Sequence, residues 1–457
     1  MKIIILGAGQ VGSSTAESLV NEGNDVTVID QNPVLLERLQ EHLDIRTVVG
    51  YAAHPGTLLK AGIKDTDMLI AVTHNDEINM IACQIASSLF NTPKKLARIR
   101  AADYLEYPAL LALDAVPIDV IISPEQLVTD YITHLIEQPE VLQVLTFFED
   151  RARLVAVRVD AGSIMDGKAI HDLLDLLPKI QMRIAAIFRN ESAISLGGKI
   201  TLQAEDEVFF LAEKHQISEL VKVFKKDYQP YKRIFIAGGG QIGKQLAQRL
   251  EKSHNVKIIE HNENRARVIA EELHHSLVLH GDVGDASLLK EEYIHKTDVF
   301  CAVTNDDEAN ILSAMLAKRL GARKTFSIIS KASHVELVEG TSIDIAVSPA
   351  QITIGTLLTH IRRGDVITVH SLRQGAAEAI EIVAHGDKQT SKVVGRKLSE
   401  LKLPKTATVG AILRKEKILF AEKNVQIESG DHLVIFLTEQ QDVDEVEKLF
   451  QVGFEFL

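Results

Sequence analysis

Cysteine is scarce in this chain of 457 residues, where only Cys83 and Cys301 occur. The small secreted domains that depend on disulfides carry several closely spaced pairs of cysteines. The composition therefore excludes a disulfide framework and favours a reducing compartment such as the cytosol.

Long apolar runs and a surplus of basic residues are also missing. No run of about 18 apolar residues occurs, so the sequence predicts no membrane-spanning helix, and Gly7 and Gly9 interrupt the first apolar run too early for a signal peptide.

Acidic residues outnumber scattered basic ones by 63 to 50, giving a net charge of −13. Because nucleic-acid binding depends on neutralising phosphates, this balance argues against nucleic acid as the main partner. We expect a cytoplasmic protein.

The chain has, instead, an extensive internal repeat. The stretch GAGQVG at 7–12 recurs as GGGQIG at 238–243, DMLIAVTHNDEINM at 67–80 recurs as DVFCAVTNDDEANI at 298–311, and IDVIISPEQ at 118–126 recurs as IDIAVSPAQ at 343–351. Because these matches keep their order, the chain consists of two tandem copies. They are joined near 225–233, a charged stretch that contains Pro230 and is typical of a linker.

Each copy divides into two parts. In the first part short apolar strands alternate with amphipathic helices, which indicates a parallel sheet covered on both faces. The second part has alternating strands such as RLVAVRVD and short helices, typical of a small α+β domain. Between them a helix with one apolar stripe, at 123–138 and at 348–363, needs a partner surface and is a candidate crossover or dimer element. The first-copy strands are predicted at 2–6, 26–30, 46–49, 68–72, 96–100 and 119–122, and the four domains at 1–123, 143–227, 232–348 and 368–453.

A glycine-rich turn follows the first strand of each copy. In the GxGxxG spacing the first glycine permits the tight turn, the second lets a pyrophosphate approach the backbone, and the third lets the helix pack close to the sheet. The N-terminus of the following helix offers unpaired N–H groups to phosphates. The turns therefore indicate nucleotide sites, with a tight turn that binds no ligand as the alternative.

An acidic residue ends the second predicted strand of each copy, Asp30 in the first and Glu260 in the second. A carboxylate at this place accepts hydrogen bonds from a ribose hydroxyl and repels a 2′-phosphate, so the first copy favours NAD(H) over NADP(H). An adenine mononucleotide such as ATP or ADP uses the same ribose and phosphate contacts. For the second copy both kinds of ligand remain open.

The loop after the fourth strand carries Thr73 and His74 in the first copy and Thr304 and Asn305 in the second. One interpretation is a helix cap, with the threonine at the N-terminus and an acidic residue three positions later. Ligand contact is a compatible interpretation, because ligands of open α/β sheets lie beyond the carboxyl ends of the strands.

Arg98 ends the fifth predicted strand and is placed to face the same crevice. There its guanidinium is suited to pair with a pyrophosphate, and a surface arginine without a ligand is the alternative. The matching residue of the second copy is Ile328, so a phosphate site there must do without this arginine, with Lys331 as the nearest substitute.

Neither copy supplies a catalytic constellation. A dehydrogenase needs an acid–base residue and usually a cation for its substrate, and the second parts of the copies offer no such pairing. The chain has no HExxH, GxSxG, Walker A or paired-cysteine motif. We therefore predict a nucleotide sensor that is not an enzyme. The alternatives are a soluble NAD-dependent oxidoreductase with a duplicated cofactor domain, and a structural subunit whose nucleotide sites are vestigial.

The order of GAGQVG, Asp30, VTHNDEINM, ARIRA, IDVIISP and a small α+β part resembles an RCK (KTN) module. The whole chain resembles the tandem RCK proteins that are cytosolic regulatory subunits of bacterial Trk-type potassium uptake systems. The resemblance implies an α/β fold of two tandem modules. Each module has a Rossmann-like doubly wound parallel sheet, a crossover helix and a small α+β C-terminal lobe.

The resemblance also implies ligands, partners and contacts. By this resemblance we expect the protein to bind NAD(H) and also ATP or ADP. We also expect its chains to assemble into a homo-oligomeric ring, a tetramer, at the cytoplasmic face of the inner membrane. There the ring gates a membrane-embedded Trk potassium channel or transporter subunit. The family's nucleotide contacts fall on Gly7, Ala8, Gly9, Gln10, Val11, Asp30, Thr73, His74 and Arg98 in the first copy, and on Gly238, Gly239, Gly240, Gln241, Ile242, Glu260, Thr304 and Asn305 in the second.

Overall fold

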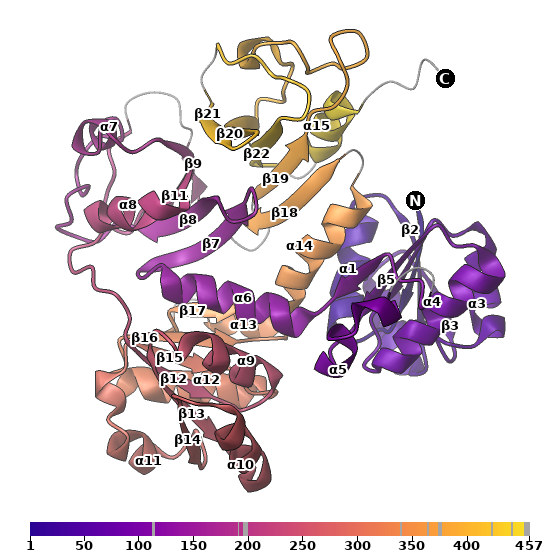
Figure 1. The fold of residues 1–457 in the computed structure, drawn as a ribbon, viewed down its shortest axis with the longest axis horizontal. Coiled ribbons are helices and arrows are strands. Elements are labelled where there is room, and N and C mark those ends of the chain that lie inside the picture. The colour runs from indigo at the N-terminus through magenta and orange to yellow at the C-terminus, as the bar shows by residue number, and fades with distance from the viewer. Residues whose placement is uncertain are drawn as a thin grey trace.

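The computed structural model has two lobes with parallel sheets and two with antiparallel sheets (Figure 1). In chain order we call them the first parallel lobe, the first antiparallel lobe, the second parallel lobe and the second antiparallel lobe. No helix among the described residues combines the length and apolarity needed to cross a membrane. The structure describes residues 1–111, 115–190, 192–194, 200–338, 341–362, 365–372, 377–421, 424–439 and 442–451.

The first parallel lobe is an open sheet with strand order β3-β2-β1-β4-β5-β6. Its central strands are buried on both faces, as the apolar sequences predict. Strand order reverses between β1 and β4, and ligands of such sheets bind beyond the carboxyl ends at this point. Its elements are β1 (Lys2–Leu6), α1 (Gln10–Asn21), β2 (Asp25–Asp30), α2 (Pro33–His42), β3 (Arg46–Val49), α3 (Pro55–Ala61), β4 (Met68–Ala71), α4 (Asp76–Phe90), β5 (Lys94–Arg98), α5 (Ala102–Leu105) and β6 (Val120–Ile122).

The second parallel lobe repeats this arrangement, with strand order β14-β13-β12-β15-β16-β17. The repeat in the sequence is therefore a repeat in topology. Its elements are β12 (Arg233–Ala237), α9 (Gln241–Leu250), β13 (Asn255–Glu260), α10 (Glu263–Glu272), β14 (Leu277–His280), α11 (Ala286–Glu291), β15 (Val299–Ala302), α12 (Asp307–Arg319), β16 (Lys324–Ile328), α13 (Ala332–Val338) and β17 (Ile345–Val347).

Each antiparallel lobe is a five-stranded sheet with a helix near its end, in orders β10-β9-β11-β8-β7 and β18-β19-β22-β20-β21. The first contains β7 (Val141–Phe147), β8 (Ala152–Arg158), α7 (Asp172–Leu176), β9 (Met182–Arg189), β10 (Ser192–Ala193), β11 (Glu207–Glu213) and α8 (Ile217–Phe224). The second contains β18 (Val366–Leu372), β19 (Ala377–Val383), β20 (Ala407–Arg414), β21 (Lys417–Phe420), β22 (His432–Leu437) and α15 (Val443–Phe450). Side chains of both sheets, including Phe147 and Phe436, form one apolar cluster between them.

The two crossover helices are exchanged between the copies. Helix α6 (Pro124–Glu137) packs on α9 of the second parallel lobe, and α14 (Pro349–Ile361) packs on α1 of the first (Figure 1). Val128 and Ile132 of α6 share a core with the first antiparallel and second parallel lobes, whereas Leu357 of α14 shares one with the first parallel and second antiparallel lobes. The partner surface that each apolar stripe requires is therefore supplied by the other copy.

The fold confirms the predicted α/β class with two tandem modules. One strand lies two residues earlier than predicted, because β5 covers Lys94–Arg98 and not 96–100. Lys95 is buried in this strand, where its Nζ lies 2.9 Å from the Asp119 carboxylate and donates to the Thr92 carbonyl at 3.1 Å. A hydrophobic pattern treats lysine as exposed, so it places the start of this strand two residues too late.

Candidate functional site

The two glycine turns share one backbone geometry. Gly7 follows β1 with a φ of +104°, and Gly238 follows β12 with a φ of +110°, a conformation that glycine adopts at little cost. A Cβ atom on Gly12 would lie 1.9 Å from the Gly7 carbonyl oxygen, and one on Gly243 would lie 1.9 Å from that of Gly238. The first glycine therefore makes the turn and the third permits close helix packing, as the spacing predicts.

The helix after each turn begins without a side-chain cap. Gly9 and Gly240 are the N-cap residues of α1 and α9, and neither first turn contains an acidic residue. By contrast, side-chain oxygens of Asn32, Asn75 and Ser123 cap α2, α4 and α6. A Cβ atom on either N-cap glycine would meet no atom within 4 Å. Both helices therefore present amide groups and open space that suit an anion such as a pyrophosphate.

Asp30 is held at the end of β2 by two main-chain amides. Its Oδ2 accepts a 2.7 Å hydrogen bond from the amide of Ala8, and its Oδ1 accepts one of 2.8 Å from Asn32. Glu260 receives the corresponding bonds at 2.9 and 2.8 Å in the second parallel lobe. Because each carboxylate oxygen has two lone pairs, the Asp30 and Glu260 carboxylates can both accept a further hydrogen bond from a ribose hydroxyl.

The carboxylate of the second copy is more enclosed than that of the first. Glu260 is 6% exposed, and its Oε2 lies 3.5 Å from the Nη1 of Arg265. A Cβ atom on Gly239 would lie 2.6 Å from the Ile269 side chain and 2.9 Å from the Glu260 carboxylate, whereas the first copy has Ala8 at this place. The second turn is therefore covered by an apolar side chain and partly neutralised by an arginine.

A buried asparagine holds the loop after β4. The Oδ1 of Asn79 accepts from the Thr73 amide at 3.0 Å and from its hydroxyl at 2.7 Å. Its Nδ2 donates to the Thr73 carbonyl at 3.3 Å and to the Arg98 carbonyl, at the end of β5, at 2.9 Å. Asn310 makes the same four bonds in the second copy. The loop is therefore fastened to the neighbouring strand in both copies.

The interpretation of the two threonines as helix caps is wrong. The N-cap of α4 is Asn75, which accepts from the Ile78 amide at 2.7 Å, and the N-cap of α12 is Asp306, which accepts from the Ala309 amide at 2.8 Å. The hydroxyl of Thr73 bonds to the buried asparagine instead. The cap lies two residues later than predicted because the asparagine fixes where the loop ends.

Arg98 forms an ion pair at the edge of the crevice. Its Nη2 lies 3.0 Å from the Oε1 of Glu125, the second residue of α6, and both side chains are 17% exposed. The Nε of Arg98 and the Oε2 of Glu125 are buried and have no hydrogen-bond partner among the described residues. Orphaned buried polar atoms are costly, so this pair has bonding capacity that a polar ligand would use.

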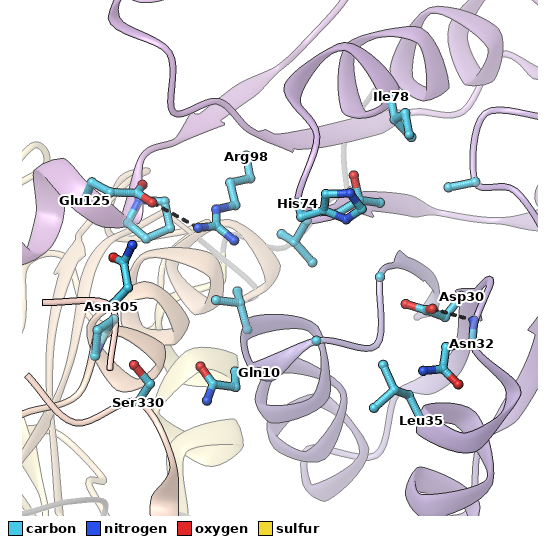
Figure 2. Close-up of a pocket in the computed structure, with 18 of the residues that line it drawn as sticks. Gln10, Asp30, Asn32, Leu35, His74, Ile78, Arg98, Glu125, Asn305 and Ser330 are labelled. Carbon is cyan, nitrogen blue, oxygen red and sulfur yellow. Dashed lines mark hydrogen bonds and ion pairs between the residues drawn. The ribbon is translucent and has the colours of Figure 1, made fainter. Parts of the chain in front are cut away.

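These elements surround a pocket of about 500 Å³ between the two parallel lobes (Figure 2). Figure 2 shows Asp30, Asn32 and Leu35 at one end and Arg98, Glu125, Asn305 and Ser330 at the other, with Gln10 between them. The volume is typical of a site for a small molecule. Of the predicted residues, the pocket brings together Gly7, Gly9, Gln10, Val11, Asp30, Thr73, His74 and Arg98 from the first copy and Ile242, Thr304 and Asn305 from the second.

The other predicted residues do not line this pocket. Ala8 is buried behind the turn and contributes only its amide, to Asp30. Lys331 pairs with Glu308 at 3.2 Å and is no substitute for the arginine at this pocket. The remaining five belong to the turn and second strand of the second parallel lobe: Gly238, Gly239, Gly240, Gln241 and Glu260.

Sequence reasoning missed Glu125, although the repeat contains a signal for it. Arg98 corresponds to Ile328, and Glu125 corresponds to Ala350 in the match of 118–126 with 343–351. Both charged residues are thus replaced together by apolar ones, as expected for two side chains in contact. Ser330, which also lines the pocket, lies in a loop with no distinctive pattern.

Among the residues that the structure describes, no evident catalyst lies near this pocket. Burial raises the pKa of the Cys83 thiol to about 12 and raises that of Cys301 as well, so neither is a nucleophile at neutral pH. Among the described residues no group of three or more histidine, cysteine, aspartate or glutamate side chains is arranged to hold a metal ion. The arrangement is suited to binding.

Two family models match the chain. A model described as the TrkA-N domain matches residues 3–124 and 234–349. A model described as the TrkA-C domain matches residues 154–225 and 388–451. Together these matches cover most of both copies.

Curated relatives match over the whole length. The chain is 51% identical over 456 residues to the Trk system potassium uptake protein TrkA of Halomonas elongata and 51% identical over 458 residues to that of Vibrio alginolyticus, covering 100% of both chains each time. It is 31% identical over 459 residues to TrkA homolog 1 of Methanosarcina mazei, covering 99% of this chain and 100% of that one. These relatives are named as potassium uptake proteins, in agreement with our prediction that the chain is not an enzyme.

Solved structures share the fold. The GsuK RCK domain superposes with a TM-score of 0.62 at 16% identity, covering 98% of this chain and 94% of that one. The GsuK channel bound to NAD gives a TM-score of 0.62 at 17% identity, covering 98% and 78%. The arrangement of four lobes is therefore that of known RCK proteins.

Proposed function

The chain belongs to the TrkA family of Trk system potassium uptake proteins, and from this premise we propose that it binds NAD(H), and ATP or ADP, between its parallel lobes and so gates a membrane potassium subunit. The partner is a membrane-embedded Trk channel or transporter subunit, which the protein binds at the cytoplasmic face of the inner membrane. No chemical step is needed, because a change of shape carries the signal.

One observation carries this proposal, namely that residues of both parallel lobes line one pocket. A ligand that contacts both lobes has an affinity that depends on their separation, so it favours one arrangement over another. The shift in equilibrium equals the difference in affinity between the two arrangements, typically about 1–3 kcal/mol for each site. Several sites in one assembly add these contributions.

The pocket suggests how a dinucleotide is oriented. The Asp30 end suits a ribose, and the uncapped N-terminus of α1 suits the pyrophosphate. The far end, with Arg98, Glu125 and Asn305, is left for the second half of a dinucleotide or for the terminal phosphates of ATP. The orphaned atoms of the Arg98–Glu125 pair fit such a polar group.

Replacing the ion pair by its second-copy counterpart tests this orientation. We expect Arg98→Ile combined with Glu125→Ala to weaken NADH and ADP binding by roughly 10- to 100-fold, because charge-assisted hydrogen bonds to phosphate contribute about 1.5–3 kcal/mol. Folding should be preserved, since the second copy has Ile328 and Ala350 at these places. Isothermal titration calorimetry of the full chain measures the affinities.

One control variant and one measurement in cells complete that experiment. Lys331→Ala, at a residue that does not line the pocket, should bind as the wild type does. Unchanged affinity in the double variant would contradict a phosphate role for Arg98. In cells that depend on a Trk-type system for potassium uptake, loss of regulation in the double variant alone would connect binding to gating.

The second turn is proposed as a weaker or different site. The cover of Ile269 and the Arg265 contact of Glu260 make this carboxylate less available to a ribose. A ligand that approaches Gly239 would meet the Ile269 side chain. NAD(H) and an adenine mononucleotide both remain candidate ligands there.

Exposed apolar side chains of the two parallel lobes support self-association into a ring. Ile81 on α4 and Leu312 on α12 occupy corresponding places, and so do Tyr107 and Leu337, and each is more than half exposed. Exposed apolar residues repeated at the same places in both lobes indicate an interface that both lobes use. A second copy of the chain is the occupant that we propose.

A pair of charges on this surface should break the assembly. We expect Ile81→Asp combined with Leu312→Asp to convert the oligomer to single chains, because the carboxylates would be buried unpaired at every interface. Light scattering coupled to size-exclusion chromatography measures the mass. Ile164→Asp, at an exposed residue of the first antiparallel lobe, is the matched control. An unchanged mass in the double variant would place the interface elsewhere.

A further inference from the structure

A second pocket, of about 520 Å³, lies where the first parallel lobe meets the second antiparallel lobe. We call it the histidine pocket. None of the described residues lines both this pocket and the one between the parallel lobes. Lys94 begins β5 and lines the histidine pocket, whereas Arg98 ends the same strand and lines the other pocket. The strand separates these two residues by roughly 13 Å, so the pockets are distinct sites.

Nitrogen-bearing side chains predominate among the charged and titratable groups of the histidine pocket. Asp365 is the one carboxylate among the described lining residues, and its side chain is 63% exposed, so solvent weakens the effect of its charge. Arg362 is already paired, with Nη2 2.9 Å from Glu22 and 3.1 Å from Glu378. The other groups are left to offer hydrogen bonds to an anion. The six groups are Lys94, His360, Arg362, Asp365, His385 and His432.

The ammonium group of Lys94 has no carboxylate to neutralise it. Its Nζ donates a 2.6 Å hydrogen bond to the His360 carbonyl, and no described carboxylate lies within ion-pair distance. Burial lowers the pKa of Lys94, opposed by Asp119. Burial and the charge of Lys94 also lower the pKa of His360, so this ring is a neutral N–H donor near pH 7. A partly buried cation without an ionic partner is unfavourable, and a bound anion would relieve it.

Two further imidazole rings of the pocket are held by carboxylates. The Nδ1 of His432 lies 2.8 Å from the Oε1 of Glu381, which is 2% exposed and also accepts from the Phe148 amide at 2.9 Å. The Nε2 of His385 lies 2.6 Å from the Oδ2 of Asp365. No described group bonds the second nitrogen of either ring. A carboxylate on one ring nitrogen fixes the ring, so the other nitrogen is available to a ligand.

The corresponding junction of the other copy is closed by its own ion pairs. Lys324 begins β16 as Lys94 begins β5, and its Nζ lies 3.3 Å from the Oε2 of Glu140. Arg323 pairs with the same carboxylate. The histidine pocket has Pro93 at the place of this arginine. Both cations of the other junction are therefore used by its own carboxylate, whereas the ammonium group of the histidine pocket is not.

Two carboxylates of the other copy are replaced by histidines in the histidine pocket. Strand β22 begins with His432 where β11 begins with Glu207, and Glu207 pairs with Arg158 at 3.0 Å. His385 follows β19 by two residues, as Asp160 follows β8, and Asp160 is held by an ion pair of 2.8 Å. Each replacement removes a negative charge and adds a ring N–H donor. Both changes suit the binding of an anion.

We propose that the histidine pocket binds a small anion that carries phosphate groups, with Lys94, His360, His385 and His432 as donors. A phosphate group has up to two negative charges and several acceptor oxygens near pH 7, which suits one ammonium group and several ring donors. The volume is in the range of small-ligand sites. The anion would bridge β5 to the second antiparallel lobe and so hold the two lobes together. This site does not depend on the proposed function.

Calorimetric titration of the full chain with sodium pyrophosphate at pH 6.5 tests the site, since free histidines are about half protonated there. The parent chain carries Arg98→Ile and Glu125→Ala, which remove the ion pair of the other pocket. We expect Lys94→Met to weaken pyrophosphate binding roughly 10-fold and His385→Gln to weaken it roughly 3-fold. Lys64→Met, at an exposed lysine of the same lobe outside the pocket, should bind as the parent does.

Hydrogen exchange measured by mass spectrometry locates the bound anion. At about ten times the dissociation constant of pyrophosphate, protection should rise roughly tenfold in peptides of β5 and β18, because opening the junction releases the anion. Peptides of β16 and β7, at the corresponding junction, should not change. The same concentration should leave protection in Lys94→Met close to that without pyrophosphate.

Vesicles distinguish a soluble phosphate compound from a phospholipid head group, since both carry the same chemistry. The chain is sedimented with vesicles of phosphatidylglycerol and, as a control, with vesicles of zwitterionic phosphatidylcholine. Pyrophosphate binding that Lys94→Met weakens supports the site with a soluble ligand. Binding to phosphatidylglycerol alone, also weakened by Lys94→Met, supports the site with a lipid head group.

Two results would overturn the anion site. One is equal binding of both probes by the parent, Lys94→Met and His385→Gln, and the other is binding of neither probe by the parent. Should Lys94→Met fold poorly, His385→Gln decides the outcome, because its side chain is 48% exposed and its replacement leaves the core intact. NADH affinity is measured separately on the wild type, so failure of nucleotide binding alone leaves the anion site standing.

Discussion

Replacing Gly12 by alanine is expected to destabilise the first parallel lobe by about 3 kcal/mol or more and to abolish nucleotide binding there. The new Cβ atom would lie 1.9 Å from the Gly7 carbonyl oxygen, which is main-chain and cannot rotate away. Helix α1 must then move off the sheet, and the turn that presents its amides moves with it. Denaturant unfolding and calorimetric titration with NADH measure the two effects.

Gly9→Ala separates steric fit from ligand contact. A Cβ atom on Gly9 meets nothing within 4 Å, so the stability of the lobe should stay within about 0.5 kcal/mol of the wild type. The methyl group would nevertheless occupy the space that a pyrophosphate approaches, so NADH affinity should fall. Equal stability of the two variants would contradict the packing role of Gly12, and unchanged NADH affinity in Gly9→Ala would contradict the phosphate site.

Replacing Asn79 by alanine is expected to cost about 3–5 kcal/mol. The substitution removes four hydrogen bonds and leaves the Thr73 amide and the Arg98 carbonyl without their partner in a buried place. Each unsatisfied buried group costs about 1–3 kcal/mol, and the lost volume adds a cavity. Asn310→Ala should destabilise the second parallel lobe by a similar amount, since it makes the same bonds.

Asn75→Ala is the matched control for this loop. It removes the side-chain cap of α4 at the residue directly after His74, with an expected cost of about 1 kcal/mol. Differential scanning calorimetry and denaturant unfolding compare the three variants. A cost for Asn79→Ala no larger than that for Asn75→Ala would show that the loop is not held by the buried asparagine.

The parts of the fold that depend on local sequence were predictable. The alternation of strands and helices and the glycine spacing concern neighbouring residues, and they predicted a parallel sheet covered on both faces, which the repeat placed in both copies. The exchange of α6 and α14 was not predictable, because an apolar stripe shows that a helix needs a partner without showing which one. Packing between distant segments has no local signature.

The same distinction holds at the candidate site. Gly7, Asp30 and Arg98 reach the pocket because each lies at or just after the carboxyl end of a strand that borders the crevice. The threonine of the β4 loop was misassigned as a cap because the asparagine that holds it, six residues later, is buried and looks like any polar residue of a helix. Glu125 was missed because its partner is 27 residues away.

The exchange of crossover helices has a consequence for how the two copies diverge. A symmetric dimer of identical chains must carry every substitution at both equivalent positions, so its two sites change together. When the two copies are fused in one chain, a substitution can change one site without changing the other. The exchanged helices α6 and α14 still hold the two copies together. One copy retains Arg98 and Glu125 where the other has Ile328 and Ala350, and the pairs Glu137–Arg153 and Arg362–Glu378 carry opposite polarity. Gene duplication has thereby given one chain two sites on which selection acts separately.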